Sequence, residues 1–204
     1  MRQTRILSVQ PENRAESVRQ ATDALKRGSL VIVPTDTVYG VAADPRACGA
    51  EERLFEAKGR DKTKPVALLA ASLADIEKYG AILTELDIRL ASMFWPGPLT
   101  LVLTVGERTE GFRIPDFEPA LMLLREVGNV LRVTSANLSG QPPALTAGDA
   151  VRAIGAFVAV ALDAGPSPGG TPSTVARVEN ERLRILREGA IKRETLEKEC
   201  RIVL

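Results

Sequence analysis

The chain has 204 residues, 45% of them hydrophobic and 26% charged, and its formal net charge is +1. This size and composition are typical of a globular protein with a sizeable core. The near-neutral charge argues against a general polyanion-binding protein, and the absence of histidine excludes Ser-His-Asp and Cys-His catalysis as well as histidine-ligated metals.

The termini and the cysteines favour a cytoplasmic protein. No apolar segment of signal-peptide type follows Met1, and no run reaches the roughly 18 apolar residues of a membrane span. Cys48 and Cys200 lie far apart and outside any CxxC motif, which indicates neither a disulfide framework nor a zinc site. We therefore expect a reducing compartment and no membrane association.

The apolar pattern predicts helices and strands that alternate along the chain. A capping box at Asn13–Glu16 begins a helix that Gly28 ends, and Leu30–Val33 forms a strand. The further elements expected are a helix over 51–58 ending at Gly59, a strand over 66–70, helices that begin at Ser72 and Thr84, a strand over 99–103, a helix over 120–126, and strands over 130–133, 157–162 and 184–186. This alternation, without a repeat or a linker, predicts one α/β domain with a mixed sheet over residues 1–204.

The first strand ends in a group of polar residues. Pro34 follows the apolar run, and Thr35, Asp36, Thr37 and Tyr39 come directly after it. Ligands bind at strand ends in open α/β sheets, so this segment is a candidate binding site, with an ordinary polar turn as the equally open alternative.

Four cations lie within seven residues at the expected end of the helix over 51–58: Lys58, Arg60, Lys62 and Lys64. Such a cluster can be a solvated turn that complements the helix dipole, or a phosphate clamp in which Arg supplies paired hydrogen bonds and Lys a point charge. In the second interpretation Lys58 and Arg60 lie at the surface of a cleft, outside the core.

A second polar group follows the strand over 130–133 and contains Ser135 and Asn137. Capping of the next turn would also explain these side chains. Two polar strand ends beside a cationic loop could instead hold a nucleotide triphosphate. No Walker A sequence is present, so the chain is not a P-loop enzyme.

Two further segments extend this candidate site. The Gly/Pro-rich loop over 165–173 is either a flexible connection or a lid or wall of a substrate site, and Arg187 follows it. Arg113 is bracketed by apolar residues, and a buried arginine needs an anionic partner, either a carboxylate or a phosphate.

Together, Pro34–Gly40, the Lys58-x-Arg60 pair, Phe94–Thr100, Ser135-x-Asn137 and Pro172–Thr174 resemble the YrdC/Sua5 family in order, over about residues 10–192. The resemblance implies a twisted, open mixed sheet flanked by helices, with a large, concave, positively lined cleft. It also implies threonylcarbamoyl-AMP synthase activity, in which L-threonine, bicarbonate or CO2 and ATP give L-threonylcarbamoyladenylate and pyrophosphate. The product would supply the threonylcarbamoyl group of N6-threonylcarbamoyladenosine in tRNA through downstream transfer proteins, and direct tRNA binding is left open.

The resemblance also implies roles for individual residues. The nucleotide contacts would be Lys58, Arg60, Thr109, Ser135, Asn137 and Arg187, and the four expected to be catalytic are Lys58, Arg60, Ser135 and Asn137. The threonine contacts would be Thr35, Thr37, Arg113 and Ser173, with Arg113 on the carboxylate. Mg²⁺ would enter with ATP and be held mainly through phosphates, without a dedicated protein site. The chemistry would rest on orientation of the reactants and neutralisation of phosphate charge.

The chain departs from the family pattern at two candidate contacts. Leu69 and Pro143 stand where some longer members have His and Ser. The chain resembles the short form, without the C-terminal Sua5 domain. The alternatives are a YciO-type paralogue, a non-catalytic RNA-binding module of the same fold, and a carbamoyl-transfer domain as in hydrogenase maturation proteins. The near-neutral charge and the aromatic content of 4% count against the RNA module.

Overall fold

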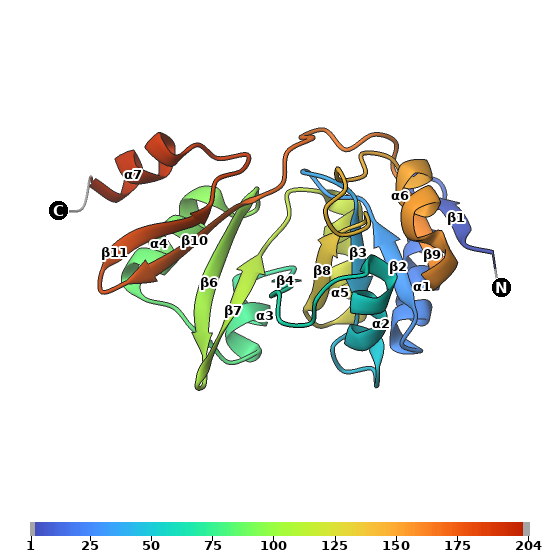
Figure 1. Ribbon diagram of the computed structural model, residues 1–204, viewed down its shortest axis with the longest axis horizontal. Coiled ribbons are helices and arrows are strands. Elements are labelled where there is room, and N and C mark those ends of the chain that lie inside the picture. Colours follow the sequence, from blue (N-terminus) through green and yellow to red (C-terminus); the bar gives the residue numbers. More distant parts are fainter. Residues whose placement is uncertain (1–2, 202–204) are drawn as a thin grey trace.

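The computed structural model describes residues 3–201 and has the α/β architecture that the sequence predicts (Figure 1). Its helices are α1 (Arg14–Lys26), α2 (Ala50–Lys58), α3 (Leu73–Lys78), α4 (Glu85–Phe94), α5 (Glu118–Val127), α6 (Ala147–Ile154) and α7 (Arg193–Arg201), with a 3-10 turn at Gly155–Phe157. Its strands are β1 (Arg5–Ser8), β2 (Leu30–Val33), β3 (Gly40–Ala43), β4 (Ala67–Leu69), β5 (Ala81–Ile82), β6 (Leu99–Val105), β7 (Arg108–Arg113), β8 (Leu131–Ser135), β9 (Val158–Asp163), β10 (Thr174–Glu179) and β11 (Arg182–Arg187).

Within residues 3–201, the strands form one mixed sheet in the order β1-β9-β2-β3-β8-β4-β7-β6-β10-β11, with β5 paired to β6. The pairs β1–β9, β2–β9, β4–β7 and β6–β10 are parallel, and the others are antiparallel. Figure 1 shows β1 and β11 at opposite ends of the molecule. The mixed sheet expected from the sequence is confirmed.

The helices cover the sheet in three groups. The helices α1 and α5 pack on one face of β2, β9 and β8, and α2 and α6 pack on the opposite face (Figure 1). A third apolar cluster joins α3, α4 and α7 to β4, β6, β7 and β10. On β6 the leucines Leu99, Leu101 and Leu103 enter this third cluster, so Thr100 and Val102 face the other side of the sheet.

Several expected elements need correction. The Asn13 side chain makes no capping bond, because its backbone (φ −112°, ψ −8°) already lies near the helical region and not in the extended conformation of an N-cap. Thr84 and Asp87 do form a complete capping box, and Ser72 accepts from the Asp75 N–H. The elements that the sequence pattern did not predict are β1, β3, β5, β7, β10, α6 and α7.

Polar composition explains why β7 was missed. Its residues Arg108–Arg113 carry three charges and one glycine, which is a poor strand signal, and tertiary pairing with β4 and β6 holds it extended.

No helix within the described residues has the length and apolarity needed to cross a membrane. Cys48 is free and exposed, whereas the side chain of Cys200 lies outside the described part of the structure.

Candidate active site

A cavity of about 520 Å³ lies over β4, β6, β7, β8 and β10, and we call it the cleft. Its lining contains four arginines and, among the described residues, no carboxylate. The arginines are Arg60, Arg113, Arg177 and Arg187. Side chains that alternate along the strands form its floor, such as Thr109, Gly111 and Arg113 on β7 and Thr100 and Val102 on β6. Such a surface is suited to an anionic ligand.

Arg113 anchors one end of the cleft and is almost fully buried. Its guanidinium forms an ion pair with Asp36, and its Nε donates to the Gly97 carbonyl oxygen at 3.0 Å. Its Nη1 donates to the Thr37 hydroxyl at 2.8 Å. Burial lowers the pKa of Arg113 and the Asp36 carboxylate opposes that shift. The anionic partner that the sequence predicted is therefore a carboxylate of the chain itself, from the polar end of β2.

The turn after β2 brings two threonine hydroxyls to the same end. The Thr35 hydroxyl donates to the Val38 carbonyl oxygen at 2.6 Å and lies 3.0 Å from the Thr37 hydroxyl. Both threonines are buried and both line the cleft. The polar strand end predicted to be a binding site is thus part of the cleft.

Ser173 and Arg187 also line the cleft and contact each other. The Arg187 guanidinium donates to the Ser173 carbonyl oxygen at 2.8 Å, and the Ser173 hydroxyl lies 2.8 Å from that of Thr100. Burial and the neighbouring Arg60 lower the pKa of Arg187.

The loop over 165–173 packs against the turn after β2. The Gly170 N–H donates to the Thr37 carbonyl oxygen at 2.8 Å. A Cβ at Gly169 would lie 2.5 Å from the Asp36 carbonyl oxygen, so only glycine permits this approach. With Pro172 and Ser173 in the lining, the loop forms a wall of the cleft.

The residues expected at the nucleotide divide into two groups. Arg60, Thr109, Ser135 and Arg187 line the cleft, whereas Lys58 and Asn137 are absent from the described lining. Lys58 is only 2% exposed, so the expectation that it lies at the cleft surface is wrong. Its ammonium donates to the carbonyl oxygens of Ser135 and Asn137, and burial together with the charge of Arg60 lowers its pKa to about 8.

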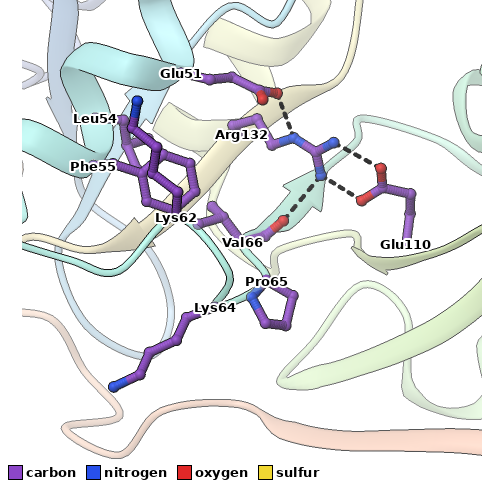
Figure 2. Close-up of a pocket in the computed structure, with 9 residues that line it drawn as sticks. All are labelled: Glu51, Leu54, Phe55, Lys62, Lys64, Pro65, Val66, Glu110 and Arg132. Atoms are coloured by element: carbon purple, nitrogen blue, oxygen red, sulfur yellow. Dashed lines mark hydrogen bonds and ion pairs between the residues drawn. The ribbon is translucent and has the colours of Figure 1, made fainter.

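The remaining cations of the basic loop lie beside a smaller pocket of about 190 Å³, which Figure 2 shows. Lys62, Lys64 and Arg132 all line this pocket. Arg132 donates to Glu51 at 2.6 Å and makes two bonds to Glu110 at 2.5 and 2.7 Å (Figure 2). Burial disfavours the charge on Arg132, but these carboxylates outweigh it and raise its pKa. This arginine is therefore committed to a structural network.

A family model described as "Telomere recombination", that of Sua5, YciO and YrdC, matches residues 23–189. The chain belongs to the Sua5/YciO/YrdC family. The family resemblance is thereby confirmed.

Named relatives of this Sua5/YciO/YrdC chain include the threonylcarbamoyl-AMP synthase of Bacillus subtilis, which is 34% identical over 191 residues. That alignment covers 88% of this chain and 55% of the relative. A Mycobacterium tuberculosis protein, provisionally given the same name, is 39% identical over 196 residues that cover 91% of this chain and 90% of the relative.

The structure of Pyrococcus abyssi Sua5 complexed with L-threonine has a TM-score of 0.91 and 32% sequence identity to this chain. It covers 96% of this chain, which in turn spans 61% of the Sua5 chain.

The cleft residues of this Sua5/YciO/YrdC chain that were not assigned from the sequence include Thr100, Gly111 and Arg177. The alternation of Leu with Thr and Val over 99–103 was a usable signal for Thr100, because it places the leucines in the core and Thr100 on the opposite face. Arg177 lies on β10, a strand that was not predicted, so no local signal pointed to it.

Proposed function

We propose that the protein is a threonylcarbamoyl-AMP synthase, which converts L-threonine, CO2 or bicarbonate and ATP into L-threonylcarbamoyladenylate and pyrophosphate. One observation supports this most directly. Residues expected at the nucleotide (Arg60, Ser135, Arg187) and residues expected at threonine (Thr37, Arg113) line the same cavity. The family relatives named above carry the same activity in their names.

The nucleotide phosphates are held by Arg60 and Arg187, whose guanidinium groups can make paired hydrogen bonds to phosphate oxygens. Arg60 uses Nη2 for the Pro65 carbonyl oxygen at 3.1 Å, and its buried Nε has no hydrogen-bond partner among the described residues. That unpaired donor supports an anion as its partner. The Ser135 and Thr109 hydroxyls supply further contacts from β8 and β7.

Lys58 and Asn137 act indirectly in this proposal. Lys58 binds the carbonyl oxygens of Ser135 and Asn137, and the Asn137 side chain donates to the carbonyl oxygens of Leu138 and Gln141 at 2.8 and 2.7 Å. These bonds set the conformation of the loop that follows β8. Their contribution to catalysis is to place Ser135.

The amino acid occupies the end of the cleft at Arg113. A guanidinium has five N–H groups, and three of those of Arg113 are used within the protein, so one on each Nη is left for the threonine carboxylate. Thr35, Thr37 and Ser173 surround this position with hydroxyls.

The chemistry then needs no histidine. The threonine nitrogen bonds to the carbon of CO2 and loses a proton, a carbamate oxygen attacks the α-phosphorus, and the bond from that phosphorus to its bridging oxygen breaks as pyrophosphate leaves. The protein orients the two substrates in one cavity and neutralises the charge of the phosphates through Arg60 and Arg187.

Mg²⁺ enters as part of the substrate MgATP. The described residues contain no group of three or more His, Cys, Asp or Glu side chains that could hold a metal, and the donors in the cleft are hydroxyls and carbonyls. This donor set fits an ion held chiefly by phosphates and water.

The product is an activated acyl group and requires a downstream transfer protein that places it on an adenosine of tRNA. A cytoplasmic location agrees with the free, exposed thiol of Cys48.

Pyrophosphate release tests the proposal. The purified protein is incubated with ATP, Mg²⁺ and bicarbonate, with and without L-threonine, and with other amino acids as controls. Release that requires both threonine and bicarbonate is expected. ATP binding without threonine-dependent release would contradict the proposal and favour a YciO-type paralogue.

A further inference from the structure

The hydroxyls at the amino-acid end of the cleft differ in what they can offer a ligand. Thr35 gives its single hydroxyl proton to the Val38 carbonyl oxygen, so in the Thr35–Thr37 pair the donor is Thr37. The Thr37 oxygen also accepts from Arg113 Nη1. What remains on Thr37 is one lone pair, which can accept from an ammonium or an amine but cannot donate.

Thr100 and Ser173 form a second hydroxyl pair, and this pair retains both properties. The two oxygens are 2.8 Å apart, and the residues are 4% and 8% exposed. Thr100 makes no other side-chain hydrogen bond among the described residues, and Ser173 Oγ has only a long 3.4 Å contact from Arg187. One proton of the pair and its remaining lone pairs are therefore free for a ligand.

The backbone fixes this pair firmly. Thr100 lies on β6 directly opposite Val175 of the parallel strand β10, and Ser173 comes immediately before β10. The Thr174 N–H donates to the Pro98 carbonyl oxygen at 3.0 Å, and the Gly97 carbonyl oxygen accepts from Arg113. The segment over 97–100 thus supports Ser173 and Arg113 together.

We propose that Thr100 is a specificity-determining positioning residue that orients the Ser173 hydroxyl toward the β-hydroxyl of L-threonine. This inference rests on the proposed function. The arginines of the site can only donate and Thr37 can only accept, whereas a β-hydroxyl is both donor and acceptor. The Thr100–Ser173 pair matches it, Arg113 takes the carboxylate, and Thr37 takes the amine.

The competitor that this arrangement rejects is L-valine, which has the shape of threonine with a methyl group in place of the hydroxyl. A site built to bond a hydroxyl discriminates strongly against an analogue that lacks it, because its own polar groups are then left unpaired.

The test compares Thr100→Val with wild type by threonine-dependent pyrophosphate release and by inhibition with L-valine. Thr100→Val is expected to raise the KM for threonine about tenfold or more and to leave the inhibition constant of valine within about twofold. Thr100→Ser keeps the hydroxyl and should retain the wild-type preference. Thr104→Val is the matched control, because Thr104 is exposed on the same strand and absent from the described cleft lining.

Equal weakening of threonine and valine in Thr100→Val would show a structural role alone and overturn the inference. If that variant does not fold, Ser173→Ala removes the same pair from its other side, and an unchanged preference there would also overturn it. Absence of threonine-dependent release in the wild-type protein is a different result, since it rejects the proposed function itself.

Discussion

The ammonium of Lys58 donates a hydrogen bond to the backbone carbonyl oxygen of Ser135, 77 residues further along the chain. A second bond reaches the Asn137 carbonyl oxygen at 2.7 Å, and the Ser139 N–H donates back to the Lys58 carbonyl oxygen at 2.9 Å. The end of α2 and the loop after β8 are therefore joined in both directions. The cationic motif predicted to be a phosphate clamp contains one residue that shapes the site and one, Arg60, that lines it.

Replacement of Lys58 by Met should cost stability as well as activity. The variant loses two charge-assisted hydrogen bonds and leaves two buried carbonyl oxygens without a donor, so the free energy of unfolding should fall by about 3 kcal/mol. Urea denaturation measures this loss. Full activity loss with unchanged stability would instead favour a direct phosphate contact.

The lowered pKa of Lys58 predicts a pH dependence. Because its pKa in the folded protein is about 8 and its usual value is 10.5, the folded state binds this proton less tightly than the unfolded chain does, and between these two pH values the unfolded chain holds more protons. The stability of wild type relative to Lys58→Met should be constant below pH 8 and rise by about 3 kcal/mol toward pH 10.5. The free energy of unfolding of both proteins, measured from pH 8 to pH 10.5, tests this prediction, because the other titrating groups contribute equally to both and cancel in the difference. A difference that does not change with pH would contradict it.

Asp36→Asn should destabilise the protein by about 3 kcal/mol, because it leaves the buried Arg113 guanidinium without a counter-charge. The two side chains are only 12% and 7% exposed. A Glu118→Gln control breaks an exposed ion pair with Arg125 and should change stability by less than about 0.5 kcal/mol. The melting temperatures of the two variants distinguish these effects. An equal decrease in both would show that the buried Asp36–Arg113 pair stabilises the protein no more than an exposed ion pair does.

Arg60→Ala should abolish adenylate formation and leave the fold intact. Arg60 lines the cleft and makes one exposed backbone contact, so the expected change in stability is below about 0.5 kcal/mol, while kcat/KM for ATP should fall about 100-fold or more. Arg125→Ala, a change of equal size at an exposed surface position, serves as the control. Near-normal turnover by Arg60→Ala would remove Arg60 from the phosphate site.

Removal of Mg²⁺ with EDTA should stop pyrophosphate release without lowering the melting temperature of the ligand-free protein. The reason is that the ion is expected to arrive with ATP and to have no carboxylate site of its own within the described residues. A melting temperature that falls in EDTA would point to a resident metal and contradict this assignment.

The sequence by itself determined the locally encoded features. Leu30–Val33 is β2 as predicted, and the alternation in 99–103 placed the leucines of β6 in the core. Gly28 and Gly59 adopt left-handed conformations just past α1 and α2, as their positions predicted. These signals depend only on residues within a few positions of one another, so the local sequence is enough to predict them. The ordered motifs also identified the family, and most of the site residues assigned from the sequence line the cleft.

Only the tertiary structure decided which of these residues meet and how each is used. Arg113 could have bound a phosphate or a carboxylate, and the partner is Asp36, 77 positions away, because the fold brings the turn after β2 to the end of β7. Lys58 was correctly placed at the end of α2, but its burial depends on the loop after β8. Thr100 meets Ser173 through the pairing of β6 with β10. Such contacts arise from strand order and packing between distant segments, for which the local pattern of a sequence carries no signal.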